Sequence, residues 1–174
     1  TFRDGNPEVY VMLADGSSES NVSFHADRDE DPDWARSFDR VGLVDPTSGA
    51  WHLSSPLEET FFFYGNPGDV PFMGDWDCDG VDTPGLFRLS DAFAYLRNSN
   101  TQGVADIRFF FGNPADIPLA GDFDGDGIDE VGLHRESTGF VYYRNTLTTG
   151  VADNEFFFGD PGDRFVTGDW GLVD

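Results

Sequence analysis

"GDFDGDGIDEVGLHR" (residues 121–135) has aspartate at alternate positions 122, 124 and 126 before it runs into an apolar segment, and the stretch has a second copy in the chain. Forty-seven positions earlier the sequence reads GDWDCDGVDTPGLFR. At this shift residues 74–120 align with 121–167 without a gap, and 25 of the 47 aligned positions are identical. A repeat of about 40 to 50 residues is typical of stacked or circular arrays, because one such unit cannot bury its apolar face alone.

Each unit has the pattern of four β-strands. In the third unit the expected strands are IPLAGDF, EVGLHR, FVYYRN and EFFFG, separated by the acidic loop, an STG turn and a polar connection. Apolar residues at helical spacing are absent, and Phe runs such as 109–111 indicate strands that are covered on both faces. We therefore expect an all-β fold, and specifically a β-propeller of about four 47-residue, four-stranded blades.

The units are expected at approximately 22–73, 74–120 and 121–167, with a partial blade from 1–21 plus 168–174, all within a single domain of residues 1–174. The inner strands are predicted at about 22–26, 70–74, 117–121 and 164–168, and the hairpins that follow them at about 1–13, 41–54, 85–98 and 131–145. The last inner strand lacks a hairpin and the first hairpin lacks an inner strand, so pairing of the N- and C-terminal strands would complete a fourth blade. A closed four-bladed ring, a homodimer that completes a larger ring, and a piece of a longer array all agree with the sequence.

Composition limits the classes of partner. With 39% hydrophobic and 16% aromatic residues, the 174-residue chain can bury a core. Its 33 acidic and ten basic residues give a net charge of -23, which argues against nucleic acid and against anionic membrane surfaces. No apolar stretch approaches about 18 residues, so we expect no membrane insertion. The N-terminus lacks the pattern of a signal peptide, and a chain that starts at Thr1 looks like a mature product or an excised fragment. Cys78 has no partner for an internal disulfide.

The acidic loop of the third unit has the ligand plan of a cation site. Asp122, Asp124 and Asp126 stand at positions 1, 3 and 5, Ile128 at position 7 offers a backbone carbonyl, and Glu130 stands at position 9. Several carboxylates at alternate positions suit a hard cation that takes six to eight oxygens in flexible geometry. Calcium is therefore the expected cofactor.

The second unit repeats the plan with Asp75, Asp77, Asp79, Val81 and Thr83. Thr83 replaces Glu130, so this site has one charge fewer and is expected to bind calcium more weakly. Asp82 and Asp129, at position 8, either ligate the ion or hold the loop through backbone hydrogen bonds, and the second role is favoured.

The first unit keeps the alternation in Asp27, Asp29, Asp31 and Asp33, but Pro32 stands where the other loops have Gly. Proline fixes φ near −65° and supplies no amide donor, so a third calcium site here would need a changed loop. The simpler alternative for all the loops is that Asp-Gly pairs form polar hairpin turns. Two gapless copies with three alternating aspartates favour calcium, because crowded carboxylates repel one another without a counter-ion.

The segment FFGNPADIPLAGDFDGDGIDEVGL (110–133) resembles the FG-GAP repeat of integrin α-subunit propellers and of related calcium-binding repeats in secreted bacterial proteins. In that family Phe-Gly precedes an inner strand that leads into D-x-(D/N)-x-D-G-x-x-D. The resemblance covers roughly residues 22–170. It implies a β-propeller, calcium bound between the first two strands of a blade, and an extracellular role in adhesion or surface display. The chain departs from the family at Thr83 and Glu130, where the pattern ends in Asp, and in supplying about four blades instead of the usual seven.

The sequence also bears on two other functions, an enzyme and a lectin. The three histidines, His25, His52 and His134, have no metal-ligand spacing, and no G-x-S-x-G or H-E-x-x-H motif occurs, so we expect no enzyme. A calcium-dependent lectin is the alternative, because Trp34, Trp51, Trp76 and Trp170 could stack on sugar faces. Trp76 aligns with Phe123 and with Trp170. This favours a packing role for Trp76 and Trp170, and leaves Trp34 as the residue to test for sugar binding. The expected module is thus secreted or displayed on a cell surface, with a protein or glycan ligand on a propeller face.

Overall fold

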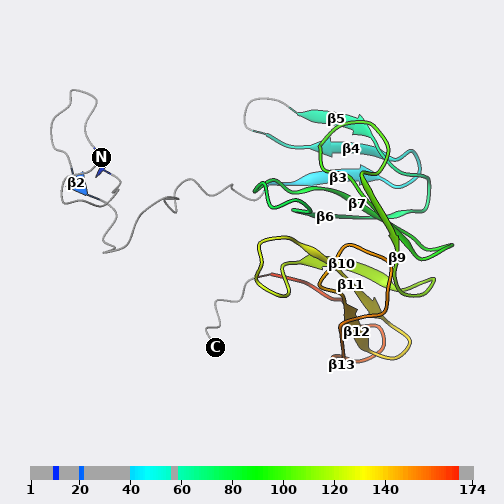
Figure 1. Ribbon diagram of the computed structural model, residues 1–174. Helices are drawn as coiled ribbons and strands as arrows, with labels where there is room; N and C mark the ends of the chain where they lie inside the picture. Colours follow the sequence, from blue (N-terminus) through cyan, green and yellow to red (C-terminus); the bar gives the residue numbers. More distant parts are fainter. Residues whose placement is uncertain (1–9, 12–19, 22–39, 56–58, 169–174) are drawn as a thin grey trace. The chain divides into compact units, whose positions relative to one another are not determined.

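The structure is a computed structural model that describes residues 10–11, 20–21, 40–55 and 59–168 (Figure 1). Its tertiary contacts divide the chain into two units, Thr1–Phe38 and Asp39–Asp174, which are described separately. All regular structure in the described residues is β. No helix that is long and apolar enough to cross a membrane occurs in this part of the chain.

The unit Asp39–Asp174 contains three antiparallel sheets that follow one another along the chain (Figure 1). Strands pair with their neighbours in sequence, so every sheet is a simple up-and-down arrangement. The first sheet contains β3 (Gly42–Asp45), β4 (Ala50–Leu53) and β5 (Thr60–Phe63). The second contains β6 (Val70–Gly74), β7 (Thr83–Arg88), β8 (Phe93–Leu96) and β9 (Ile107–Phe110). The third contains β10 (Ile117–Gly121), β11 (Glu130–Arg135), β12 (Phe140–Tyr143) and β13 (Asn154–Phe157).

The sequence repeat coincides with a structural repeat. Each strand of the third sheet lies 47 positions after its counterpart in the second, from Val70 and Ile117 at the start to Phe110 and Phe157 at the end. The prediction of an all-β chain is confirmed for the described residues, and two sheets have the four strands predicted for each unit. The first sheet has three described strands. The inner strand predicted at about 22–26 lies outside the described residues.

Glycine before the first strand of a sheet leaves space for a buried leucine of the second strand. A Cβ built on Gly65 would lie 2.6 Å from Leu86 Cδ1, and one built on Gly112 would lie 2.1 Å from Leu133 Cδ1. Each glycine precedes the first strand of a sheet, and each leucine belongs to the second strand of that same sheet. The Gly of the repeated Tyr/Phe-Gly pair therefore makes room for a core leucine.

Two apolar clusters join the three sheets of this unit. One contains Trp51 and Phe62 of the first sheet, Tyr64 directly after that sheet, and Leu86 of the second sheet. The other contains nine buried residues from Trp76 to Leu133, among them Phe109 and Phe111 beside Val131 and Leu133. Burial of these large side chains, at roughly 25 cal/mol per Å² of apolar surface, is the main term that holds neighbouring sheets together.

One predicted strand is wrong. Residues 164–168, expected as an inner strand, form no strand in the structure. Their counterparts, β6 and β10, pair with β7 and β11, whereas no described strand follows residue 168. A strand is stable only when its backbone groups are paired, so the sequence pattern alone does not form one.

In the unit Thr1–Phe38 the described residues form a two-stranded antiparallel sheet, β1 (Tyr10–Val11) and β2 (Ser20–Asn21). The hairpin predicted at about 1–13 lies mostly outside the described residues, and its described part, Tyr10–Val11, pairs with Ser20–Asn21. The polar segment 14–21 lacks the FFFG motif, and the sequence provided no other strand signal there. Backbone pairing does not require apolar side chains, which explains why β2 was missed.

Candidate metal centre

The loop between β10 and β11 brings four acidic side chains together. One carboxylate oxygen of each of Asp122, Asp124, Asp126 and Glu130 lies within 4.8 Å of those of the others. Asp75, Asp77 and Asp79 form the equivalent group between β6 and β7. Among the described residues, these are the two places where three or more potential metal-ligating groups converge.

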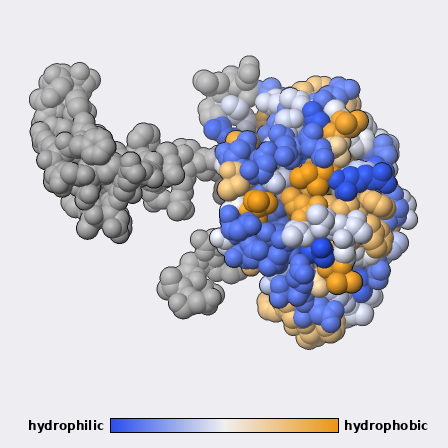
Figure 2. Space-filling model, viewed as in Figure 1, coloured by the Kyte–Doolittle hydropathy of each residue, from blue (hydrophilic) through white to orange (hydrophobic). Residues whose placement is uncertain are grey.

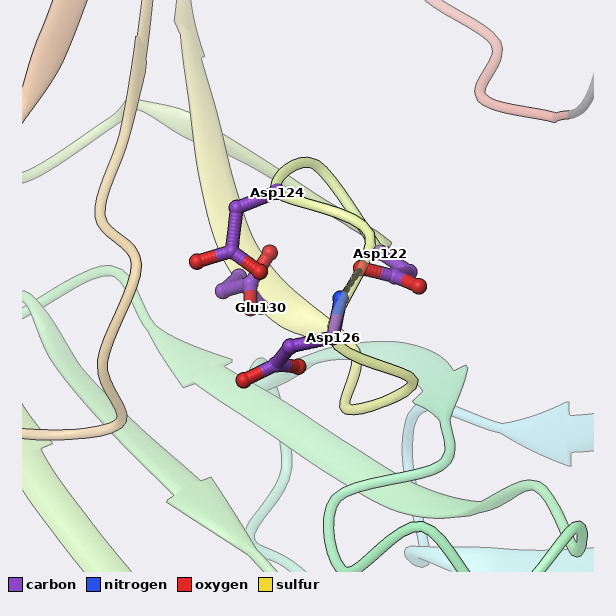
Figure 3. Close-up of side chains that lie close together, drawn as sticks. All are labelled: Asp122, Asp124, Asp126 and Glu130. Carbon is purple, nitrogen blue, oxygen red and sulfur yellow. Dashed lines mark hydrogen bonds between the residues drawn. The ribbon is translucent and has the colours of Figure 1, made fainter.

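The first aspartate of the third-unit loop organises the backbone around itself. Asp122 Oδ1 accepts hydrogen bonds from the amides of Gly125 (2.7 Å) and Asp126 (3.1 Å), and Oδ2 accepts one from Gly127 (3.0 Å). Figure 3 shows the bond between Asp122 and the Asp126 amide, and shows the carboxylates of Asp124 and Glu130 next to each other. Asp126 Oδ1 in turn accepts the Ile128 amide at 2.9 Å. The alternating aspartates thus face a common region because the loop is wound around one of them.

The second-unit loop has the same arrangement. Asp75 accepts the amides of Asp79 at 3.1 Å and Gly80 at 2.8 Å, and Asp79 Oδ1 accepts the Val81 amide at 2.9 Å. Cys78 adopts φ +59° where the third unit has Gly125 at φ +81°. The loop conformation is therefore retained even though a cysteine occupies a position that favours glycine.

Position 9 distinguishes the two loops. The Glu130 residue is only 2% exposed, Glu130 Oε2 accepts the Phe123 amide at 2.8 Å, and burial raises the pKa of this carboxyl to about 7. Thr83 is also buried, and its hydroxyl donates to the Gly74 carbonyl at 3.3 Å. The third-unit loop therefore offers four carboxylates and the second-unit loop three.

The two loops are joined to each other. The Asp75 amide donates to Asp129 Oδ2 at 2.9 Å, and the Asp129 amide donates to the Asp75 carbonyl at 2.8 Å. Burial raises the pKa of Asp129. A Cβ on Gly127 would lie 2.9 Å from Cys78 Sγ, which shows how closely the loops approach. The expected bonds of position 8 were to the backbone of its own loop, because nothing in a single repeat indicates a bond to the preceding repeat.

The other predicted ligands are placed as follows. The amides of Val81 and Ile128 bond to the aspartates, and their carbonyls remain predicted ligands. The Asp82 carbonyl accepts a hydrogen bond from Asn100 Nδ2 at 3.1 Å. Asp27, Asp29, Asp31 and Asp33 lie outside the described residues.

The arrangement suits a hard divalent cation. Carboxylate oxygens are the ligands that Ca²⁺ and Mg²⁺ prefer, and four carboxylates this close repel one another unless a cation or protons neutralise them. The donor set of Asp122, Asp124, Asp126 and Glu130 contains neither sulfur nor imidazole, which would favour softer transition metals.

The tryptophans considered for sugar binding are buried where the structure describes them. Trp51 and Trp76 are each 2% exposed, and their Nε1 groups donate to the carbonyls of Tyr64 and Thr83. Neither ring is available to stack on a glycan, whereas Trp34 and Trp170 lie outside the described residues.

The histidines also have separate surroundings. His52 Nδ1 pairs with Glu59 at the surface. His134 is fully buried against Phe165, with 4.0 Å between the ring centroids, and neither ring nitrogen has a hydrogen-bond partner among the described residues. His25 lies outside this part of the chain.

Comparison of the chain with protein-family models, with curated proteins and with solved structures gave no match.

Proposed function

We propose that this chain is a calcium-stabilised β-propeller, or a substantial part of one, that acts as an extracellular structural, adhesion or protein-interaction module. The observation that carries the proposal is the bonding of the Asp75 loop to the Asp129 loop across neighbouring sheets, beside two convergent acidic groups. A cation held by either group would fix a loop that is hydrogen-bonded to the acidic loop of the neighbouring sheet. Calcium binding would therefore stabilise the boundary between sheets, and its role would be structural.

The propeller architecture is supported by the repetition of the sheets. Up-and-down antiparallel sheets of three and four strands follow one another and share apolar clusters, as blades do. The acidic loops recur at the same end of successive sheets, between first and second strands. Such units would avoid exposed edges in one of three ways. The N- and C-terminal strands would close the ring, a second copy would complete a larger ring, or the array would continue.

The extracellular setting is what the resemblance to FG-GAP repeats implies, and it sets the calcium concentration for the test. Calcium modules outside cells bind at roughly 10⁻⁴ to 10⁻³ M, which matches millimolar extracellular calcium. The large negative charge favours cations over nucleic acids or anionic membranes as partners.

The proposal is tested by thermal melts in excess EDTA, in several millimolar calcium and in the same concentration of magnesium. Calcium should stabilise the protein by about 1 to 2 kcal/mol for each of the two sites, and magnesium should do less. A matched pair of variants separates the sites from general screening of charge. Asp124→Asn should reduce the response to calcium, whereas Asp153→Asn removes one charge from the same sheet region and should leave it unchanged. A folded protein that melts at the same temperature in EDTA and in calcium would show that the loops are ordinary turns.

A glycan ligand is the alternative role for the same propeller. Because Trp51 and Trp76 are buried, the lectin hypothesis depends on Trp34. Sugar-dependent quenching of tryptophan fluorescence that disappears in Trp34→Ala would support it. The protein would then act as a calcium-dependent lectin and not as a protein-interaction module.

A further inference from the structure

The two candidate metal groups are joined by a specific link between their loops. We call Asp122, Asp124, Asp126 and Glu130 the third-unit group, and Asp75, Asp77 and Asp79 the second-unit group. Both backbone polar groups of Asp75 are hydrogen-bonded to one residue of the third-unit loop. The Asp75 amide donates to Asp129 Oδ2 at 2.9 Å, and the Asp75 carbonyl accepts the Asp129 amide at 2.8 Å. A predicted ligand of one group is therefore held by a residue of the other loop.

Asp75 in turn determines the conformation of its own loop. Its Oδ1 accepts the Asp79 amide at 3.1 Å, and its Oδ2 accepts the Gly80 amide at 2.8 Å. The carboxylates of Asp77 and Asp79 converge with that of Asp75 because the chain that carries them is wound around this one side chain. The position of Asp75, and hence that of Asp129, therefore controls whether the second-unit group is arranged to bind a cation.

Asp129 is itself held by the third-unit group. It lies between Ile128 and Glu130, whose backbone carbonyl and carboxylate are predicted ligands. Glu130 is 2% exposed, and its Oε2 accepts the Phe123 amide at 2.8 Å. No described residue donates a hydrogen bond to Glu130 Oε1, and Figure 3 shows this carboxylate next to that of Asp124. Because a cation stabilises a buried carboxylate that lacks a donor on one oxygen, binding at this group would hold both neighbours of Asp129 in place.

The link between the loops is better shielded from water than the rest of each loop. Asp75 and Asp129 are half-buried, whereas Asp77 and Asp124 are exposed. In Figure 2 hydrophilic residues predominate on the side of the molecule where the β10–β11 loop lies in Figure 1, so cations can reach the exposed carboxylates from solvent. Water competes less for half-buried hydrogen bonds, and the bonds between Asp75 and Asp129 can therefore transmit a displacement from one loop to the other.

A second contact between the loops contains no directional bond. A Cβ on Gly127 would lie 2.9 Å from Cys78 Sγ, so the backbone of one loop packs directly against a side chain of the other. Such a contact prevents closer approach, but it does not fix the orientation of either loop. Among the described residues, the hydrogen bonds of Asp129 are the specific connection between the two groups.

We propose that Asp129 couples the two groups, so that a divalent cation at the third-unit group raises the affinity of the second-unit group for the next cation. The inference rests on the proposed function, because both groups must bind calcium. The first cation fixes Glu130 and with it Asp129, and Asp129 then holds Asp75 in the conformation that winds its loop. The first cation thus removes part of the conformational entropy that the second would otherwise have to remove. Asp129 acts as a positioning residue and is not itself a ligand.

The sign of the coupling separates this mechanism from direct electrostatics. Two cations repel each other, so their mutual field weakens the second binding step. A tighter second step therefore requires linkage through the protein. By reciprocity, a cation at the second-unit group raises the affinity of the third-unit group by the same factor, and couplings of this kind are typically about fivefold or larger.

Calorimetric calcium titrations of the full chain measure the coupling. The affinity of the second-unit group is compared between the parent, in which the third-unit group is filled, and Asp124→Asn, in which that group is disabled. It should be at least about fivefold weaker in Asp124→Asn. When Asp129→Ala is present, Asp124→Asn should leave this affinity nearly unchanged. Asp129→Asn is the matched control, because its side-chain oxygen can still accept the Asp75 amide and should retain the coupling. Equal behaviour of the two Asp129 variants would overturn the hydrogen-bond mechanism.

Hydrogen exchange provides a readout that does not depend on the affinity of the second-unit group. In Asp77→Asn, calcium should bind at the third-unit group and slow the exchange of the Asp79 and Gly80 amides, which donate to Asp75. Adding Asp129→Ala should abolish this slowing, although calcium still binds. Slowing that persists without the Asp129 carboxylate would overturn the role of Asp129 and assign the coupling to the packing of the two loops.

Failure of this inference is distinguishable from failure of the proposed function. A parent protein that binds no calcium would overturn both. If two calcium ions bind, and the second-unit group has the same affinity in the parent and in Asp124→Asn, the coupling is overturned and the metal sites stand. A second-unit group that binds more tightly in Asp124→Asn would also overturn the coupling, because that is the sign expected for direct repulsion between the cations.

Discussion

Asp75 and Asp129 exchange two hydrogen bonds across neighbouring sheets, although they lie 54 positions apart. The Asp75 amide donates to the Asp129 carboxylate, and the Asp129 amide donates to the Asp75 carbonyl. Position 8 of one acidic loop is thereby fixed to position 1 of the preceding loop. The candidate metal groups are consequently part of the boundary between sheets.

Asp129→Ala should destabilise the protein in EDTA by about 1 kcal/mol or more, because the half-buried Asp75 amide loses its acceptor. The substitution should also weaken calcium binding to the Asp75 loop, because the Asp129 carboxylate would no longer hold Asp75 in place. Denaturant unfolding and calorimetric titration measure the two effects. If calcium binding to a protein with the Asp124 site disabled is unaffected by Asp129→Ala, the loops are not coupled.

Unlike Asp129→Ala, the variants Asp124→Asn and Asp77→Asn should not lose stability in EDTA. Each removes one charge from a group of carboxylates, and no hydrogen bond to the backbone is known for either side chain within the described residues. The metal-free protein should be as stable as the parent or slightly more stable, since repulsion falls, while its response to calcium should decrease. The remaining site of Asp124→Asn should be the weaker one, because it has three carboxylates where the other has four. Equal affinities in the two variants would contradict the ranking.

Glu130 should give metal-free stability a specific dependence on pH. Its pKa is raised from the ordinary value of 4.5 to about 7 by burial, so between these values the folded state holds a proton that the unfolded state has released. The stability contributed by this group is therefore present below about pH 4.5 and is lost as the pH rises to about 7. In EDTA, the difference in melting temperature between the parent and Glu130→Gln should change across this window. A constant difference from pH 4.5 to 7.5 would show that Glu130 titrates normally.

His134→Phe should stabilise the protein by about 1 kcal/mol. The substitution removes two buried ring nitrogens that have no partner among the described residues and installs the residue found at the equivalent position, Phe87, which is also fully buried. The ring would retain its contact with Phe165. Thermal melting at neutral pH measures the change, and Phe87→His provides the reciprocal variant, which should be destabilised. Loss of stability in His134→Phe would show that the imidazole has a partner that the larger ring cannot replace.

The turn before the first strand of each sheet allows two opposite substitutions, Gly68→Ala and Ala115→Gly, whose effects on stability can be compared. Gly68, Ala115 and Gly162 occupy one repeat position, and all have positive φ, of 87°, 75° and 97°. A Cβ on Gly68 would meet no atom within 4 Å, so Gly68→Ala should cost the backbone strain of about 1 to 2 kcal/mol, offset in part by the smaller entropy of alanine in the unfolded chain. Ala115→Gly should have the reverse effect, a small net gain in stability, because relief of strain outweighs the greater entropy of glycine in the unfolded chain. Chemical denaturation compares the two, and a loss of stability in Ala115→Gly would contradict a strain mechanism.

The repeat and its local structure were predictable because they depend on short stretches of sequence. The strands of the second and third sheets, the acidic loops between first and second strands, and the turns marked by glycine all follow from apolar runs and turn residues repeated at 47 positions. The carboxylates of each loop were predicted to converge for the same reason. Asp122 and Asp75 wind the loops through bonds that span five residues or fewer.

Tertiary structure decided what each repeated residue contacts. Phe111 and Phe158 occupy one repeat position, yet the first is buried and the second is mostly exposed, because within the described residues only the first has the next sheet packed over it. Likewise, residues 70–74 and 117–121 are strands, while 164–168 are not, because a strand needs a partner. The sequence by itself therefore determined the period, the strand and turn pattern and the acidic loops, all of which arise from local preferences. The Asp75–Asp129 link and the difference in exposure between Phe111 and Phe158 depend on residues far away along the chain, and only packing between sheets determines them.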